Sequence, residues 1–497
     1  MRLAELIEHL PVTLRLGSPE VEITAVTEDS RLVAAGALFV ARPGMVTDGR
    51  KFIPQAVAAG AAAILADDAS GIDPSPAALL TCDEVPLQAA ILAERFHGDP
   101  SKRLTLIGVT GTNGKTTVVS LAHQLLNRSG IRCGLIGTVH VDAGRGIHRA
   151  ALTTPPAVEI SRLLRFMVDH GCRACVIEAS SHALDQRRTA GLAFAAGVFT
   201  NLSGDHLDYH KTMEAYGGAK ARLFRAVGEG GWAVVNADDP ASEKILSGFD
   251  GRVITTSFTD EKATCFAEVG MLSSSATQAR MAGPWGEFMV RLPIVGRHNV
   301  ANALQAAAVA HRLGVNGDAL AEGLSQCAAP PGRLEPVTGE LDEITVLVDY
   351  AHTDDALDNV LCAVRPLVPE QARLVVVFGC GGDRDATKRP RMAGAACRWA
   401  DEIIVTSDNP RTEDPRAIID EILGGIPSDR RQGVLAIVDR AQAIHTAVAR
   451  AEAGDVILIA GKGHETHQII GAARRPFDDR TVAAQAILQR RARVEAV

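Results

Sequence analysis

The sequence has neither a long apolar run nor a dense cluster of basic residues. No apolar stretch approaches the roughly 20 residues that a helix needs to cross a bilayer. Glu5 and Glu8 occupy the region where a secretion signal would be basic and then apolar. The net charge of -8 argues against a general nucleic-acid or membrane-surface role, although it is compatible with a local basic pocket for an anion. We therefore expect a cytoplasmic protein without a membrane span that does not bind nucleic acid.

The nine cysteines follow neither a disulfide scaffold nor a metal-binding pattern. An odd number of cysteines scattered through a long chain favours reduced thiols. Cys172 and Cys175 form a CxxC pair, but no second Cys pair or His pair accompanies them. We assign this pair a structural role in preference to metal binding.

The chain also has no short internal repeat and no low-complexity segment. Its 497 residues, with 46% hydrophobic and 22% charged residues, are typical of a folded protein of about three domains. Pro- and Gly-rich breaks near residues 98–100 and 330–332 predict domains at 1–98, 99–334 and 335–497. Short apolar runs alternate with helical stretches in each part, which predicts an α/β fold with mainly parallel sheets in the second and third domains.

A glycine-rich loop lies between a predicted strand at 104–109 and a predicted helix at 118–126. Its sequence is Gly-Val-Thr-Gly-Thr-Asn-Gly-Lys-Thr-Thr, from residue 108 to residue 117. Such a loop lets backbone N–H groups approach phosphates, while Lys115 supplies a cation and Thr116 a hydroxyl for Mg²⁺. The usual GxxxxGK[ST] pattern would place glycine at 109, where this chain has valine. An ordinary Gly-rich turn is the alternative, and the strand and helix on either side favour a nucleotide loop.

Polar residues follow the next two predicted strands, at 174–177 and 196–199. Glu178 ends the first of these runs, and His206 lies in the segment after the second. Ligands of α/β sheets bind at the carboxyl ends of the strands, so both residues are candidates for a metal site beside the glycine-rich loop. Lys220 falls in a helical segment, and sequence alone would make it an exposed surface lysine.

The segment from Thr110 to Thr116 resembles the nucleotide loop of the Mur ligases and of their relative folylpolyglutamate synthetase, which also lacks the early glycine. Further motifs in the same order extend the resemblance over essentially the whole chain. It implies an N-terminal uridine-diphosphate-binding domain, a central P-loop ATPase domain and a C-terminal Rossmann-like domain that closes on the site. It also implies a monomeric ligase that consumes ATP, uses Mg²⁺ and forms an amide bond.

The resemblance assigns the metal and nucleotide sites to particular residues. Thr116, Glu178 and His206 would bind Mg²⁺ together with Lys220, which the family carries as a carbamate. A neutral lysine can take up CO₂ and become an oxygen-bearing anion that suits Mg²⁺. Asp354 stands where relatives often have proline. The residues implied to contact ATP are Gly111, Thr112, Asn113, Gly114, Lys115, Thr116, Thr117, Asn299, Asn302, Arg333, Asp349 and His352, and those implied in catalysis are Lys115, Glu178, His206 and Lys220.

The resemblance also points to the two other substrates. The run Asp408-Asn409-Pro410-Arg411 resembles members that add meso-diaminopimelate, whose far carboxylate an arginine fork can bind, whereas the ammonium of lysine would be repelled. Arg389, Gly461 and Glu465 are implied around the same amino acid. Met45-Val46-Thr47 replaces a His-containing stretch of the family near the uridine. The residues implied to hold the UDP-muramoyl dipeptide are Ser30, Thr153, Thr154, Ser180, Gln186 and Arg188.

The expected reaction is therefore ATP-dependent addition of meso-2,6-diaminopimelate to UDP-N-acetylmuramoyl-L-alanyl-D-glutamate through an acyl phosphate, in peptidoglycan precursor synthesis. Lysine or ornithine as the added amine remains an open alternative. Folylpolyglutamate synthetase shares the nucleotide loop but lacks the uridine-nucleotide domain and the Asp-Asn-Pro-Arg run. A P-loop protein that binds ATP without chemistry would give Glu178, His206 and Lys220 no reason to assemble.

Overall fold

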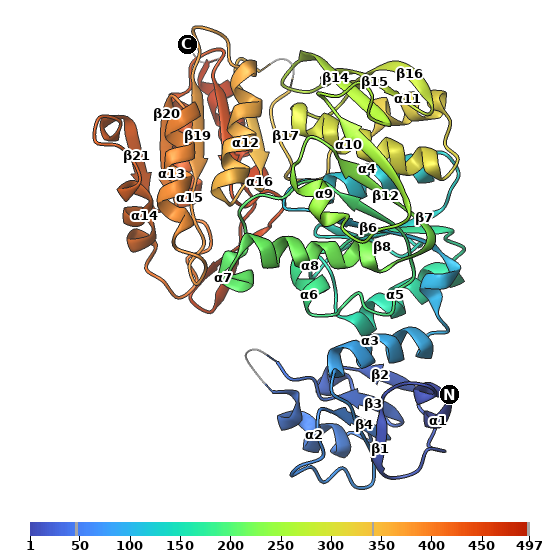
Figure 1. Ribbon diagram of the computed structural model, residues 1–497. Coiled ribbons are helices and arrows are strands. Elements are labelled where there is room, and N and C mark those ends of the chain that lie inside the picture. The colour runs from blue at the N-terminus through green and yellow to red at the C-terminus, as the bar shows by residue number, and fades with distance from the viewer. Residues whose placement is uncertain (45–47, 340–341, 495–497) are drawn as a thin grey trace.

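The computed structural model describes residues 1–44, 48–339 and 342–494, which form three successive α/β units (Figure 1). In the view of Figure 1 the first unit lies at the bottom, the second at the upper right and the third at the upper left. Each unit has its own sheet, of five, eleven and six strands respectively, and a two-stranded hairpin lies near the C-terminus. Among these described residues, none of the helices combines the length and the apolar character needed to cross a bilayer.

The first unit is a five-stranded sheet in the order β1-β5-β4-β3-β2. Its strands β2 to β5 run parallel, and β1 pairs antiparallel with β5. The buried side chains on its two faces make two small cores. The elements are α1 (Leu3–Ile7), β1 (Thr13–Leu16), β2 (Ala25–Thr27), η1 (Ser30–Leu32), β3 (Ala37–Val40), η2 (Gly49–Phe52), α2 (Ile53–Ala58), β4 (Ala63–Ala66), β5 (Ala78–Thr81) and α3 (Val85–Phe96).

A buried glutamate joins the first unit to the second. Glu94, near the end of α3, accepts hydrogen bonds from the backbone N–H of Ser101 at 2.7 Å and from the hydroxyl of Ser161 at 2.8 Å. A buried carboxylate is costly unless such donors satisfy it. The predicted boundary at 98–99 stays a prediction, and this contact shows how closely the chain packs on either side of it.

The second unit has an eleven-stranded sheet in the order β16-β15-β14-β13-β12-β11-β6-β10-β7-β8-β9. The strands from β14 to β7 are parallel, as predicted, because apolar runs such as β6, β10 and β11 are buried on both faces. Antiparallel hairpins, which were not predicted, extend the sheet at both edges. The strands are β6 (Thr105–Thr110), β7 (Cys133–Ile136), β8 (His140–Asp142), β9 (Ile147–Arg149), β10 (Ala174–Glu178), β11 (Phe194–Phe199), β12 (Val227–Asn236), β13 (Arg252–Ser257), β14 (Cys265–Leu272), β15 (Thr277–Gly283) and β16 (Gly286–Leu292).

Helices cover both faces of this sheet. One core includes residues of α4, α10 and α11, and the other includes residues of α5, α6 and α8. These helices are η3 (Pro100–Arg103), α4 (Lys115–Arg128), α5 (Ala157–Asp169), α6 (Ser181–Asp185), α7 (Leu207–His210), α8 (Met213–Arg225), α9 (Ala241–Ile245), α10 (Arg297–Arg312) and α11 (Gly317–Gln326).

The third unit is a six-stranded sheet in the order β17-β18-β22-β19-β20-β21, parallel except for the short β17. Helices α12, α13 and α14 pack on one face, and α15 and α16 on the other, as a Rossmann-like layer arrangement requires. The elements are β17 (Glu335–Pro336), β18 (Thr345–Asp349), α12 (Asp354–Val364), η4 (Arg365–Leu367), β19 (Leu374–Phe378), α13 (Lys388–Trp399), β20 (Glu402–Thr406), α14 (Pro415–Gly424), η5 (Arg431–Gly433), β21 (Val434–Ile437), α15 (Arg440–Arg450), β22 (Val456–Ala460), β23 (His467–Ile470), β24 (Ala473–Pro476) and α16 (Asp479–Val494).

The short connection between the second and third units packs tightly. A methyl group added at Gly332 would lie 2.2 Å from the backbone of Gly463 and His464. The connection therefore touches the loop that follows β22, at the carboxyl edge of the third sheet. The predicted boundary at 334–335, which lies next to this contact, stays a prediction.

Candidate active site

The glycine-rich loop joins β6 to α4 at the carboxyl edge of the central sheet. Gly111 and Gly114 have φ angles of +148° and +86°, which favour glycine. Space also requires glycine, because a methyl group at Gly111 would lie 1.8 Å from the Thr200 hydroxyl, and one at Gly114 would lie 2.3 Å from the Asn302 amide oxygen. The Lys115 ammonium curls back over the loop and donates to the carbonyls of Gly111 at 2.9 Å and Thr112 at 2.7 Å.

The end of β11 holds this loop in shape. The backbone N–H of Thr112 donates to the Asn201 carbonyl at 2.8 Å, and that of Asn113 donates to the Asn201 side-chain oxygen at 2.9 Å. The Thr200 hydroxyl donates to the Asn113 carbonyl at 2.6 Å. Thr200 and Asn201 were not predicted as site residues, although Asn201 lies in the polar segment that drew attention to His206.

Glu178 lies beside the first turn of α4, because β10 and β6 are aligned so that Glu178 is paired with Val109. It is 1% exposed. Its carboxylate accepts hydrogen bonds from the Thr116 hydroxyl at 3.1 Å and from the backbone N–H and hydroxyl of Thr138 at 2.7 and 2.9 Å. A carboxylate and a hydroxyl within hydrogen-bond distance form an oxygen donor pair that fits Mg²⁺. Thr138 was not predicted.

Lys220, on α8, lies in the same site. It is 1% exposed, and its ammonium donates to the Gly111 carbonyl at 2.7 Å, so it shares an acceptor with Lys115. Burial, reinforced by the charge of Lys115, holds the pKa of Lys220 well below its ordinary value. The interpretation of Lys220 as an exposed surface lysine is wrong, because α8 directs this side chain under the nucleotide loop.

An aromatic side chain supports Lys220. Its ammonium lies 4.1 Å from the centre of the Tyr216 ring, close enough for a cation–π contact. The Tyr216 hydroxyl donates to the Thr112 hydroxyl at 3.2 Å. Tyr216 therefore links the buried lysine to the loop, a role that the sequence pattern did not indicate.

His206 approaches this site from the segment after β11 but contacts other residues. Its ring nitrogen lies 3.3 Å from the Asp205 carboxylate, and its ring packs 4.7 Å from that of His182. Burial lowers the pKa of His206 against the opposing attraction of Asp205. Within residues 1–44, 48–339 and 342–494, no three His, Cys, Asp or Glu side chains converge as a metal cluster. Thr116 and Glu178 lie within hydrogen-bond distance of each other. The predicted binding of Mg²⁺ by these two residues together with His206 and Lys220 stays a prediction.

Two side chains from the later part of the chain reach the nucleotide loop, one from the connection between the second and third units and one from the third unit. Arg333, in the connection before β17, donates to the Thr116 hydroxyl at 3.2 Å. Asp355, on α12, accepts hydrogen bonds from the Asn113 amide at 2.9 Å and the Ser203 hydroxyl at 2.6 Å. Arg333 was predicted as an ATP contact, and Asp355 was missed because nothing in its local sequence signals a partner 242 residues away.

Asp349 ends β18 and His352 follows it closely, and the side chains of both residues contact nearby backbone groups. The Asp349 carboxylate accepts hydrogen bonds from the N–H groups of Leu334 at 2.7 Å and Ala351 at 2.8 Å, and burial raises its pKa. A ring nitrogen of His352 lies 2.9 Å from the Tyr350 carbonyl. In this structure Asp349 fixes the connection that carries Arg333. Their predicted contacts with ATP stay predictions.

Asn299 and Asn302 are buried at the start of α10. The Asn302 amide donates to the Asn299 side-chain oxygen at 3.2 Å, and the Asn299 amide donates to the Val295 carbonyl at 2.8 Å. Asn302 also packs against Gly114. Asn302 therefore borders the nucleotide loop and Asn299 contacts Asn302, and the predicted contacts of both residues with adenine stay predictions.

Four of the six residues predicted to hold the muramoyl dipeptide, namely Thr154, Ser180, Gln186 and Arg188, form a cluster next to Glu178. The Thr154 hydroxyl donates to the Glu178 carbonyl at 2.6 Å and lies 3.2 Å from that of Ser180. Arg188 donates to the Thr154 carbonyl at 2.8 Å and to the Gln186 side chain at 2.7 Å.

Residues of the first unit meet the edge of this cluster. Arg42, which was not predicted, donates to the Gln186 carbonyl at 3.3 Å and lies 3.6 Å from the Glu28 carboxylate. The Thr153 hydroxyl lies 3.1 Å from the hydroxyl of Thr138. The predicted Ser30 lies in the first unit, where it donates to Gln55 at 3.0 Å. The stretch Met45-Val46-Thr47 lies outside the described residues.

A second group of predicted residues gathers at the carboxyl edge of the third sheet. The Asn409 amide donates to the Glu465 carboxylate at 2.9 Å. The Lys462 ammonium, which is fully buried, donates to Asn409 at 3.1 Å and to Glu465 at 2.8 Å, and lies 3.9 Å from Asp408. A methyl group at Gly461 would lie 2.8 Å from the Asp408 carboxylate. Lys462 belongs to a predicted motif but had no predicted role.

Arg411 and Arg389 differ in how their charges are satisfied. Arg411 has a φ of +51°, a strained conformation for a residue with a side chain, and its guanidinium donates to the Gly382 carbonyl at 2.7 Å. Arg389 is 1% exposed and forms ion pairs with Glu413 at 2.8 Å and Glu421 at 2.9 Å. Arg389 is thus already neutralised in this structure, and its predicted contact with a substrate carboxylate stays a prediction.

Ring contacts and a contact between loops connect the nucleotide site with the group of residues at the carboxyl edge of the third sheet. The His464 ring lies 4.9 Å from that of Tyr350, and Tyr350 lies beneath the Arg333 guanidinium at 4.9 Å. Arg149, on β9 of the central unit, donates to Thr466. The nucleotide loop and the loop after β22 therefore belong to one continuous interface between the second and third units.

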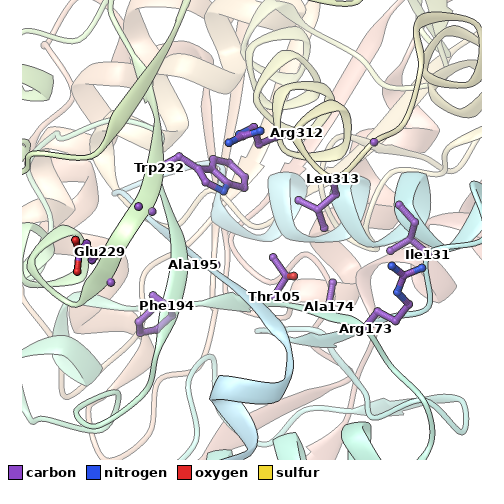
Figure 2. A pocket seen from close by; sticks show the side chains of 14 residues that line it. Thr105, Ile131, Arg173, Ala174, Phe194, Ala195, Glu229, Trp232, Arg312 and Leu313 are labelled. Atoms are coloured by element: carbon purple, nitrogen blue, oxygen red, sulfur yellow. The ribbon is translucent and has the colours of Figure 1, made fainter.

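A separate cavity of about 650 Å³ lies at the opposite edge of the central sheet (Figure 2). Its lining includes Thr105, Ala174 and Phe194, which are the first residues of β6, β10 and β11. In the view of Figure 2, Trp232 and Arg312 lie above these three residues. The nucleotide loop follows the other end of β6. This cavity is therefore not part of the candidate active site.

Comparison with known proteins gives matches along nearly the whole chain. Residues 22–94 match a model described as Mur ligase family, catalytic domain, residues 109–310 match the Mur ligase middle domain, and residues 332–463 match the Mur ligase glutamate ligase domain. These matches and the three sheets agree with the predicted three-domain α/β fold.

Relatives with curated names match over their full lengths. The UDP-N-acetylmuramoyl-L-alanyl-D-glutamate–2,6-diaminopimelate ligase of Gloeobacter violaceus is 44% identical over 99% of both chains. The enzyme of the same name from Geobacillus kaustophilus is 43% identical over 99% of this chain and 100% of the relative. A solved structure of a ligase of that name is 34% identical, with a TM-score of 0.70 over 99% of both chains.

Proposed function

The chain belongs to the Mur ligase family, and from that premise we propose that it joins meso-2,6-diaminopimelate to UDP-N-acetylmuramoyl-L-alanyl-D-glutamate with consumption of ATP. The observation that carries this proposal is that the connection and the third unit both reach the nucleotide loop of the second unit, where Arg333 of the connection donates to Thr116 and Asp355 of the third unit accepts from Asn113. The loop with the sequence Asp-Asn-Pro-Arg lies on the side of the third unit in the same interface. We also propose a cytoplasmic location, where ATP is available, and a monomeric state.

The nucleotide loop would activate the dipeptide substrate. Lys115 and the N–H groups at the start of α4 face the place of the phosphates and draw negative charge from them. The side-chain carboxylate of the D-glutamyl residue attacks the γ-phosphorus of ATP, which gives an acyl phosphate and ADP. Thr116, Glu178, His206 and carbamylated Lys220 would hold Mg²⁺, which when bound supplies further positive charge to the phosphates.

The third unit would supply the amine. One amino group of diaminopimelate, once it has lost its proton, attacks the acyl carbon, and the tetrahedral intermediate expels inorganic phosphate to leave an amide. Glu465 and Asp408 are suited to ammonium groups, and the fork of Arg411 is suited to the distant carboxylate. Closure of the third unit over the loop excludes water that would hydrolyse the acyl phosphate.

The test is a competition among amines. ADP formation is measured with UDP-N-acetylmuramoyl-L-alanyl-D-glutamate, ATP and Mg²⁺, and with meso-diaminopimelate, L-lysine or L-ornithine in turn. We expect kcat/KM for meso-diaminopimelate to exceed that for lysine by about 100-fold, because lysine leaves Arg411 without an anion and places an ammonium beside it.

Two outcomes would contradict the proposal at different levels. Equal or better turnover with lysine would remove the assignment of meso-diaminopimelate and keep the ligase. ATP binding without ADP formation under all three conditions would leave only a nucleotide-binding protein. Reactions without any amine serve as the control for uncoupled hydrolysis of ATP.

A further inference from the structure

A fully buried ion pair lies directly behind the amino-acid loops of the third unit. Arg440, the first residue of α15, pairs with Asp479, the first residue of α16, and both side chains are 0% exposed. Two parallel hydrogen bonds of 2.7 Å join the guanidinium to the two carboxylate oxygens. This bidentate geometry fixes the orientation of the guanidinium plane.

The remaining donors of Arg440 bind two backbone carbonyls from different strands. One terminal nitrogen donates to the Ser407 carbonyl at 3.3 Å, and the other donates to the Ala460 carbonyl at 2.8 Å. Ser407 follows β20, and Ala460 ends β22. These strands are not neighbours, because β19 lies between them, so no ladder hydrogen bonds fix the distance between their ends.

The residues after these two carbonyls carry the amino-acid site. Asp408 to Arg411 follow Ser407, and Gly461 to Glu465 follow Ala460. The two loops touch above Arg440, since a methyl group at Gly461 would lie 2.8 Å from the Asp408 carboxylate and 3.9 Å from the guanidinium. The Asn409 and Glu465 side chains then bind each other at 2.9 Å.

Resting on the proposed function, we propose that Arg440 is a positioning residue for the amino-acid substrate, which sets the spacing between the Asp408–Arg411 loop and the Gly461–Glu465 loop. Arg440 touches no substrate, because it is covered on all sides. It acts through the carbonyls that precede the two loops, and Asp479 keeps its guanidinium in the required plane. Its loss should therefore weaken selection of the amine and leave the nucleotide loop unaffected.

If the ion pair only stabilised the fold, folded variants that lack it should keep the parental KM and the parental exchange of both loops. A buried ion pair can often be replaced by apolar residues of similar volume with little change in stability. The double variant Arg440→Met/Asp479→Leu removes both charges together and also removes the donors to the two carbonyls. A lysine at position 440 keeps the charge but lacks the planar fork that reaches Asp479 and both carbonyls at once.

The experiment compares the full-length parent with R440K and R440M/D479L. A matched control is R373K, because Arg373 pairs with Asp455 at 2.7 Å and also donates to a carbonyl, at the amino edge of the same sheet. The measurements are KM for meso-diaminopimelate and for ATP, kcat, the melting temperature, and hydrogen exchange of the segments 407–411 and 461–465.

For both Arg440 variants we expect KM for meso-diaminopimelate to rise about tenfold, equal to about 1.4 kcal/mol, with KM for ATP within about twofold of the parent. Exchange should accelerate in both segments, and R373K should change neither quantity. Folded variants with parental KM and parental exchange would overturn the proposal, as would an equal rise in KM for ATP or a failure of both variants to fold. If the parent itself does not convert meso-diaminopimelate, the proposed function fails, while the exchange data still decide the role of Arg440.

Discussion

The two halves of the interface satisfy their buried and half-buried cations in opposite ways. At the nucleotide loop, Lys115 and Lys220 donate to the carbonyls of Gly111 and Thr112, and neither forms an ion pair within the described part of the chain. At the amino-acid loops the cations have carboxylate partners. These pairs are Arg389 with Glu413 and Glu421, Arg440 with Asp479, and Lys462 with Glu465.

This difference matches the charges of the two proposed ligands. A buried cation without a counter-charge is costly, so a protein retains one where a ligand supplies the missing anion. The phosphates of ATP would do this for Lys115, and the carbamate would convert Lys220 from a cation into an anion. Diaminopimelate carries two carboxylates and two ammonium groups, so a site that is already neutral suits it. Arg411, which donates to a carbonyl, is the local exception.

The largest expected effect is the loss of activity when Lys220 is removed from the nucleotide site. We expect Lys220→Ala to lower kcat by about 10²- to 10³-fold, because a preorganised charge at the phosphates is worth this much in other active sites. High bicarbonate should not restore activity, whereas short carboxylic acids should restore part of it by occupying the place of the carbamate. ADP formation measures both effects.

The matched control is Lys244→Ala, an exposed lysine that pairs with Glu214. This control should retain parental activity. Melting temperatures of both variants separate misfolding from loss of chemistry. Parental turnover in folded Lys220→Ala would end the carbamate proposal and the contrast between the two halves.

A substitution at Arg411 tests the amino-acid half of the interface, and its expected effect on activity is smaller. We expect Arg411→Ala to lower the preference for meso-diaminopimelate over lysine by about 10- to 100-fold, because the far carboxylate loses a bidentate partner. The ratio of kcat/KM for the two amines measures this preference, and KM for ATP should stay near the parental value.

Arg391→Ala provides the control, since Arg391 pairs with Asp354 on the surface of the same unit. If Arg411→Ala leaves the ratio of kcat/KM for the two amines unchanged, another residue binds the far carboxylate of diaminopimelate. Arg389 would then be the next residue to test, despite its two glutamate partners.

The smallest expected effect is a dependence of stability on pH. Since the pKa of Lys220 lies well below its ordinary value in the folded protein, the unfolded chain binds more protons than the folded chain between those two pKa values. The free energy of unfolding should therefore rise with pH in this window, by at most about 1.4 kcal/mol per pH unit for one group. The measurement is urea unfolding in buffers free of CO₂ and metal.

The variant Lys220→Met should have a shallower slope, because it removes a buried lysine whose pKa is lowered in the folded protein. Lys115 contributes in the same direction, since burial lowers its pKa as well. A slope equal to that of the parent would mean that Lys220 keeps its proton when folded, contrary to the buried environment described above.

The nucleotide loop could be predicted from sequence because its geometry is local. The order of strand, glycines, lysine and helix places the phosphate donors within a few residues, and β6, β10 and β11 lie where their apolar runs predicted them. Asp355, Thr138 and Arg42 could not be found in this way. Each acts through a partner distant in the sequence, and a lone Asp, Thr or Arg has no local signature.

The burial of single charged residues and the strands at the edges of the central sheet also could not be predicted from local sequence. The pattern around Lys220 does not reveal that α8 packs under the nucleotide loop, and the two glutamates that neutralise Arg389 come from a loop and a helix beyond β20. Apolar runs predicted the parallel strands because those are buried on both faces. The hairpin β15–β16 mixes buried and exposed residues, while β8 is half-buried and β9 is exposed throughout. None of these strands has a fully buried apolar run, so they were not recognised as extensions of the central sheet.

Asp355 places a carboxylate from the last third of the chain on the nucleotide loop. Exchange of parts between related enzymes is restricted as a result. A chimaera that joins residues 1–334 of this chain to the last third of a relative keeps every glycine of the loop, yet it positions Asn113 and Ser203 only if the imported helix brings its own acceptor to the same place. Recombination at that junction therefore has to preserve the contacts of Asp355 as well as two intact folds.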